Sequence, residues 1–311
     1  MTSAVATPDV VEMPPRRGLA GIAIRRFVRR PVAVGSLLIL VAVLLAGALA
    51  PIIAPHGWNF INLSPNAIHQ PPSLAHPFGT DPIGRDMLDR TIYGIRTTEE
   101  VAFGAAALAT VLGVLVGALA GFYRGWLDAV VMRIADLVTA YPAVVLTLAV
   151  IVYLGEVYPH DLILVFGAYM WVAVARVVRA HVSALRSQEF VEAARALGGS
   201  DLRILFRHLL PNAGGTILVA ATSLVGQIIL IDATVEFFNY GLSSSVAPSL
   251  GNLISDVVQT KFATPTTLVV PGSSSWWIWI LPSVVLILVL VTINLVGDAL
   301  DAALNPGAAN A

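Results

Sequence analysis

The sequence predicts an all-α polytopic membrane protein with six transmembrane helices. Hydrophobic residues make up 57% of the 311-residue chain and charged residues only 12%, whereas a typical soluble domain carries about 25% charged residues. The apolar residues gather in six runs close to the length of about 20 residues that a helix needs to cross a bilayer. The basic residues gather in the segments on one side of these runs, which gives the runs one consistent orientation.

The first predicted span, residues 31–54, contains no charged residue. Ala48-Leu49-Ala50 resembles a signal-peptide cleavage site, but the apolar run is longer than the about 7–15 residues of a signal-peptide core. We therefore expect an uncleaved span. Residues 1–30 contain Pro, Arg and Ala without a long apolar run, and we expect a partly disordered cytoplasmic tail whose arginines lie near anionic lipid headgroups.

The other five spans share an apolar length near 20 residues and follow at 101–122, 129–154, 162–182, 213–236 and 276–296. Span two carries Gly113, Gly117 and Gly121 at a four-residue spacing, which lets helix backbones approach closely. Pro142 predicts a kink in span three. The last span begins with a cluster of tryptophans, which is typical of an anchor at the membrane interface.

The distribution of basic residues sets the orientation. With both termini in the cytoplasm, fourteen of the eighteen basic residues lie inside, and those left outside are Arg85, Arg90, Arg96 and Lys261. This topology makes residues 31–311 one transmembrane domain with outer loops at 55–100 and 239–275 and a long inner segment at 183–212. Near the cytoplasmic end of span three, Arg133 and Asp136 are spaced to pair.

The inner segment is too polar to cross a membrane, yet it has helical periodicity. One face of its first half holds Phe190, Val191, Ala194 and Leu197. Gly198 and Gly199 then supply a helix stop, and Ser200 or Asp201 supplies a new N-cap. The apolar face of the second helix holds Leu202, Leu205, Phe206 and Leu209. Such a hairpin either inserts into a groove on a soluble partner or lies on the membrane surface.

The exact residues resemble the EAA loop of importer permeases of the ATP-binding-cassette class. That pattern reads Glu-Ala-Ala, three residues, Gly, nine residues, then Ile-x-Leu-Pro. Here Glu192-Ala193-Ala194 precedes Gly198, and Leu210-Pro211 follows at the expected distance, with His208 at the Ile position. In that family the loop docks on the ATPase subunit. The resemblance implies an ATPase-coupling role for Phe190, Glu192, Ala193, Ala194, Leu197 and Gly198.

Other stretches are similar to the C-type subunit of dipeptide and oligopeptide permeases, namely residues 76–86, 123–128, 141–142, 207–212, 236–242 and 248–252. Leu250 stands where that family usually has Trp, and the sequence around Phe237 is altered. The resemblance covers residues 25–300. It implies a type I importer permease in the bacterial plasma membrane that carries di- or oligopeptides, with nickel or glutathione as alternative cargoes.

The chain has no Gly-x-x-x-x-Gly-Lys-[Ser/Thr] loop to bind a nucleotide, and we expect neither a cofactor in this chain nor enzyme activity. The resemblance implies a second permease subunit, two ATP-binding subunits or one fused ATPase that hold ATP and Mg, and an extracytoplasmic substrate-binding protein. Cysteine is absent. His56, His69 and His76 share one outer loop, where solvated histidines are a simpler reading than a metal site. The net charge of -1 gives no sign of a nucleic-acid partner.

Two sets of charged residues are further candidates. Apolar residues recur near helical spacing over residues 85–100, which predicts a short helix on the outer surface. The candidate residues for docking the substrate-binding protein there are Asp81, Arg85, Asp86 and Asp89. Asp232 and Glu236, near the outer end of span five, either face the translocation path and meet a peptide's amino group or are hydrated at the interface.

Two other classes of protein stay open. A secondary transporter driven by an ion gradient would need ionisable residues at the midplane or an inverted repeat, and the sequence shows no second copy of any segment. A membrane receptor or scaffold without transport would lack an ATPase partner, so co-purification separates it from an importer.

Overall fold

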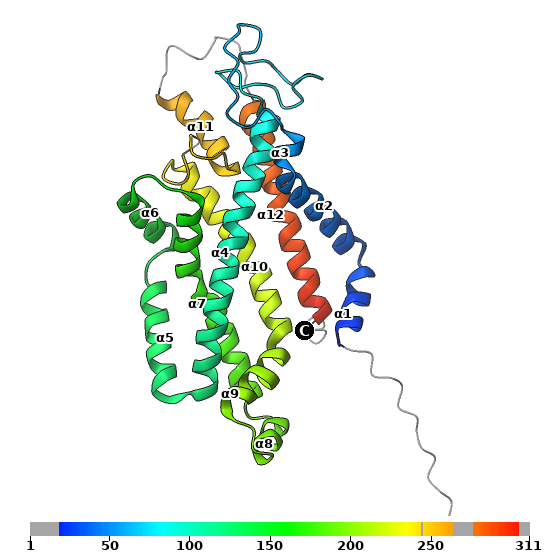
Figure 1. The fold of residues 1–311 in the computed structure, drawn as a ribbon, viewed down its shortest axis with the longest axis vertical. Helices are drawn as coiled ribbons and strands as arrows, with labels where there is room; N and C mark the ends of the chain where they lie inside the picture. Colours follow the sequence, from blue (N-terminus) through cyan, green and yellow to red (C-terminus); the bar gives the residue numbers. More distant parts are fainter. Residues whose placement is uncertain (1–18, 244, 264–275, 305–311) are drawn as a thin grey trace, which may run out of the picture.

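The computed structural model describes residues 19–243, 245–263 and 276–304, and these residues contain helices and loops but no strand (Figure 1). In chain order the helices are α1 (Leu19–Val28), α2 (Pro31–Ala48), α3 (Ala50–Ile53), α4 (Met87–Tyr123), α5 (Gly125–Thr139), α6 (Ala143–Leu154), α7 (Pro159–Leu185), α8 (Glu189–Ala196), α9 (Asp201–Ile204), the π-helical turn η1 (Leu205–Leu209), α10 (Leu210–Phe237), α11 (Leu250–Ala263) and α12 (Trp277–Leu304). The predicted all-α class is confirmed.

Five helical segments of the described chain are long and apolar enough to cross a membrane, namely α2, α4, α7, the continuous run Asp201–Phe237 and α12. Helices α5 and α6 make a sixth if they count as one span, bent by 79°. The bend lies at Tyr141 and Pro142, because proline cannot continue a helix without losing a hydrogen bond. The kink expected from Pro142 is therefore present.

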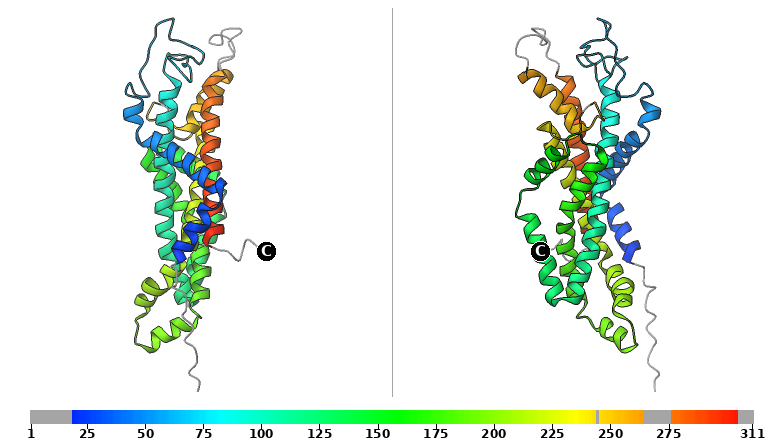
Figure 2. Two further views of the ribbon diagram at one scale, coloured as in Figure 1. Left: turned by 90° about the vertical axis from the view of Figure 1, so that its right-hand side faces the viewer. Right: turned by 60° about the vertical axis from the view of Figure 1, so that its left-hand side comes forward.

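The helices form an elongated bundle (Figures 1 and 2). Helices α8 and α9 lie at one end, which we call the inner end. Helix α11 and the long loop between α3 and α4 lie at the opposite, outer end. Helix α1 packs on α12, and both the start of α1 and the end of α12 lie in the half of the bundle nearer the inner end.

Helices α4 and α7 form the most extensive packing in the bundle. Gly113, Gly117 and Gly121 face α7 so closely that a Cβ at Gly117 would lie 2.4 Å from the Ala175 carbonyl oxygen. Small residues permit this approach of two backbones. The close packing expected from the glycine spacing is confirmed.

Two features differ from the sequence-based expectations. Residues 87–100 are not a separate surface helix, because α4 runs without a break from Met87 to Tyr123. Asp136 pairs with Arg176 at 2.9 Å rather than with Arg133. Within the tail that we expect to be partly disordered, residues 19–28 form α1. Residues 1–18 of that tail and residues 264–275 of the second outer loop lie outside the described residues.

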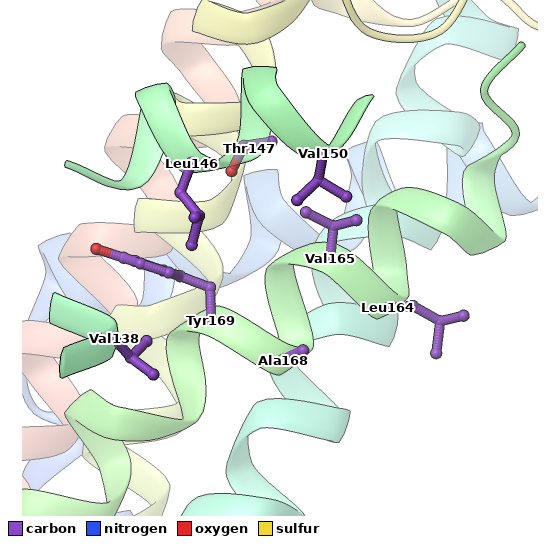
Figure 3. A pocket seen from close by; sticks show the side chains of 8 residues that line it. All are labelled: Val138, Leu146, Thr147, Val150, Leu164, Val165, Ala168 and Tyr169. Atoms are coloured by element: carbon purple, nitrogen blue, oxygen red, sulfur yellow. The ribbon is translucent and has the colours of Figure 1, made fainter. Parts of the chain in front are cut away.

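The bend between α5 and α6 leaves an apolar cavity of about 320 Å³ against α7 (Figure 3). Leu146 and Val150 of α6 line one side, and Val165 and Tyr169 of α7 line the other. The Tyr169 hydroxyl donates to the Tyr141 carbonyl oxygen at 2.9 Å. This hydrogen bond holds the broken backbone at the bend against α7.

Candidate functional site

The inner hairpin consists of α8, Gly198-Gly199 and α9, and a defined capping motif sets its shape. Gly198 has φ +81°, its N–H donates to the Arg195 carbonyl oxygen at 2.9 Å, and the Gly199 N–H donates to that of Ala194 at 3.0 Å. This is a Schellman motif, which needs a left-handed residue at the position of Gly198. The predicted glycine stop is confirmed, and it turns the chain sharply into α9.

Helix α8 does not have the single apolar face that its sequence suggests. Val191 is fully buried, and Ala194 packs beside it against the main hydrophobic core. Phe190 is exposed, and Leu197 is 89% exposed. The inward face therefore fixes the helix to its own bundle, while Phe190 and Leu197 face solvent. Glu192 and Ala193 are also exposed.

The second half of the hairpin follows the same division. Ile204, Leu205 and Leu209 are buried, whereas Leu202 and Phe206 are more than half exposed. The face expected to hold Leu202, Leu205, Phe206 and Leu209 is therefore divided between the bundle core and the exterior. We define the docking patch as the large exposed apolar side chains of the hairpin and of the turn Leu205–Leu209 that follows it, namely Phe190, Leu197, Leu202 and Phe206. Large exposed apolar groups on a polar segment indicate a binding surface.

Arginine–aromatic stacking attaches the hairpin to the membrane domain. The guanidinium carbons of Arg186 and Arg195 lie 5.5 Å and 5.8 Å from the centre of the Phe122 ring, within the range of cation–π attraction. Phe122 is at the inner end of α4 and is buried. Arg124 also donates to the carbonyl oxygen of Ser183 in α7 at 2.7 Å. The end of α4 thus contacts both the hairpin, through Arg195, and α7.

A π-helical turn joins the hairpin to α10. Leu205–Leu209 adopts the wider helix, and the Leu210 N–H donates to the Leu205 carbonyl oxygen. Pro211 follows directly, and a proline ring clashes with the carbonyl four residues earlier in a regular α-helix. A π turn at this point accommodates the proline. Pro211 therefore does not end the preceding helix, and Asp201–Phe237 is continuous.

At the outer end, Asp81 is a structural centre and not a surface residue. Its side chain is 1% exposed and accepts hydrogen bonds from the backbone N–H groups of Ile83 and Arg85, both at 2.9 Å. It also accepts from Arg85 Nε at 2.6 Å and from Arg90 Nη1 at 3.2 Å. Asp81 therefore cannot contact a docking protein, which corrects that assignment.

Asp86 caps the start of α4. Its carboxylate accepts from the N–H groups of Leu88 at 2.7 Å and Asp89 at 3.2 Å, as an N-cap residue does. The second carboxylate oxygen lies 2.6 Å from His76 Nδ1. Arg85, Asp86 and Asp89 keep partial exposure, so these three can still reach a partner.

Asp232 and Glu236 are buried within the helix bundle. Each is 1% exposed, so neither the hydrated position nor an open path describes them in this conformation. Glu236 accepts a hydrogen bond from the Ser249 hydroxyl, which fastens the segment after α10 to that helix. One oxygen of each carboxyl group is buried without a hydrogen-bond partner. Burying a polar group without a partner is costly, and such groups inside a membrane protein are candidates for function.

Arg90 is the residue that sequence reasoning did not select. It is 2% exposed and bridges Asp81 to Asp256 of α11. The sequence did contain a signal for a buried ion pair, because an arginine inside a helical apolar pattern needs a buried partner. The partner in α11 lies too far along the chain to be found by spacing.

The family model for the inner membrane component of binding-protein-dependent transport systems matches residues 113–310. The chain belongs to this family. A second model, for the N-terminal transmembrane domain of oligopeptide transport permease C, matches residues 18–72. The chain is therefore a multi-pass permease subunit of a bacterial inner membrane and not an enzyme.

Named relatives cover almost the whole permease. The dipeptide transport system permease protein of Alkalihalophilus pseudofirmus is 32% identical over 96% of this chain and 95% of its own length. A putative peptide transport system permease of Brucella suis is 34% identical over 96% and 94%. The oligopeptide transport system permease of Mycobacterium bovis is 31% identical over 92% and 94%.

Proposed function

We propose that this chain forms half of the translocation path of an ATP-driven peptide importer and that the inner hairpin couples it to an ATPase. The observation that carries the coupling is the docking patch. Its apolar side chains are exposed, while Val191 and Ala194 fix the same helix to the bundle. One face of this helix is packed on the bundle and the other exposes apolar side chains, an arrangement that suits insertion into a groove on a soluble partner.

The proposed assembly contains this chain, a second homologous permease, two ATP-binding subunits or one fused ATPase, and an extracytoplasmic substrate-binding protein. ATP and Mg belong to the ATPase. Closure of the ATPase subunits would displace the hairpin, and the continuous helix Asp201–Phe237 would carry that displacement into the bundle. Arg85, Asp86 and Asp89 stay the proposed contacts for the substrate-binding protein.

Peptides are the proposed cargo because the relatives described above are named for peptide, dipeptide or oligopeptide transport. These names favour peptides over nickel or glutathione. The family favours binding-protein-dependent transport over an ion-coupled mechanism. We propose that the inner end faces the cytoplasm, as the arginine distribution predicts.

Site-directed crosslinking tests the coupling. The chain has no cysteine, so Ala193→Cys introduces a unique thiol on the exposed side of α8. We expect a bifunctional crosslinker to join it to the ATPase subunit. Leu74→Cys, exposed at the outer end, is the matched control and should react only with an impermeant maleimide added from outside. Labelling of Ala193→Cys from outside, or no ATPase adduct in an active transporter, would refute the proposal.

A further inference from the structure

A polar cavity of about 240 Å³ lies between two turns of the chain. One wall is the turn after α6, and the other is the segment after α10. The polar side chains in its lining come from Glu156, Asn239, Tyr240 and Ser243, and the lining contains no basic residue. Neither the coupling nor the docking proposed above uses this cavity.

Glu156 is the acidic residue of the cavity lining. Glu156 is exposed on one wall, and its charge raises the pKa of the neighbouring Tyr158 phenol. On the other wall, the Glu236 side chain packs directly behind Gly241, where a Cβ would lie 2.4 Å from Glu236 Cγ. The Glu236 carboxylate accepts from the Ser249 hydroxyl and is buried behind this wall, so Glu156 supplies the carboxylate that faces the cavity. A carboxylate in a small cavity without basic residues attracts a cation.

We propose that this cavity receives a protonated primary amine, the amino terminus of the incoming peptide. The inference rests on the proposed peptide-import function. An ammonium group donates and never accepts, which matches the Glu156 carboxylate and the side-chain oxygens of Asn239 and Ser243. The volume is below the about 300–1,000 Å³ of pockets that enclose a whole drug-sized ligand, so the cavity fits one end of a peptide.

Uptake by liposomes containing the whole transporter and its substrate-binding protein tests this inference. Three peptides separate the two sources of the amine: trialanine, N-acetyl-trialanine and N-acetyl-lysyl-dialanine. For trialanine at subsaturating concentration, Glu156→Gln should lower the uptake rate about tenfold, which corresponds to the loss of one charge-assisted hydrogen bond. Glu156→Asp should restore most of it, and Glu100→Gln, which removes an exposed carboxylate on α4, should change nothing.

Each rate is compared between variant and wild type for the same peptide, so the preference of the binding protein cancels. The amino-terminal assignment is overturned if the lysyl peptide alone loses uptake, if all three lose it equally, or if trialanine uptake is unchanged. If the wild-type transporter carries no peptide at all, the proposed function fails, and this inference fails with it.

Photo-crosslinking gives a second readout that does not depend on rates. A benzoylphenylalanine at position 240, which is exposed beside the cavity, should attach to the first residue of trialanine, as fragment masses would show. The same group at position 126, exposed at the inner end, should not. Attachment at position 240 to the carboxyl-terminal residue instead would overturn the assignment.

Discussion

Arg90 of α4 and Asp256 of α11 are 166 residues apart in sequence, and Arg90 Nη2 lies 3.1 Å from Asp256 Oδ2. The same guanidinium reaches Asp81 through Nη1. One side chain therefore joins the outer loop, the start of α4 and α11. Because the guanidinium is buried, it cannot exchange these partners for water without opening the outer end of the bundle.

Replacing Arg90 should destabilise the protein strongly. Arg90→Met leaves the buried Asp81 without one of its cationic partners, and removing one member of a buried ion pair costs about 3–5 kcal/mol. We expect a lower midpoint of thermal unfolding for the detergent-purified protein. Arg96→Met, at an exposed position on the same helix, should leave the midpoint nearly unchanged. Equal midpoints for both variants would show that the bridge contributes little.

Gly198 should be required for coupling and not merely for folding. Its φ of +81° disfavours a β-branched residue, whereas asparagine tolerates the left-handed region. Gly198→Val should distort the Schellman turn, so that ATP hydrolysis continues without proportional transport. Gly198→Asn should keep most of the wild-type ratio of substrate carried to ATP hydrolysed. Normal coupling in the valine variant would exclude this role.

A charge in the docking patch should release the ATPase. Leu197 is 89% exposed, so Leu197→Glu has no packing to disturb within the chain, but it places a carboxylate in the proposed interface. We expect the ATPase to be lost from the purified complex while the permease still elutes as a single species. Leu74→Glu is the matched change at an exposed leucine of the outer loop, and it should retain the ATPase.

Close packing of α4 on α7 should tolerate no added side chain. Gly117→Val places atoms where a Cβ alone would lie 2.4 Å from the Ala175 carbonyl oxygen, and overpacking costs about 1–3 kcal/mol. A lower unfolding midpoint is the expected outcome. Gly35→Val makes the same substitution in α2, where a Cβ meets nothing within 4 Å. If both variants unfold at the same temperature, helix propensity alone accounts for the effect.

Local sequence signals predicted much of this architecture. Apolar length predicted the spans, the glycine spacing predicted the face of α4 against α7, and Gly198 predicted the turn of the hairpin. Each of these properties depends on residues close together in the chain. The docking patch was only half predicted, because periodicity marks an apolar face but does not say whether the protein's own bundle or a partner covers it.

One local property and two properties that depend on distant segments were missed. The long loop before span two was expected to carry a separate helix, yet nothing between residues 87 and 101 breaks a helix, so α4 simply continues. Asp81 was predicted to lie on the surface because the segments that bury it, which carry Arg90 and Asp256, come together only in the folded protein. Asp136 forms its ion pair with Arg176 because α7 lies beside α5. The spacing of residues within span three does not reveal that contact.

The π turn at Leu205–Leu209 has a mechanical consequence. Because it lets the helix pass Pro211 without interruption, the 37 residues from Asp201 to Phe237 make a lever about 55 Å long at 1.5 Å per residue. A tilt of about 5° at one end would sweep the other by about 5 Å, the pitch of one helical turn. A small push on the hairpin would thus become a movement of the Glu236 end wide enough to change what fits there.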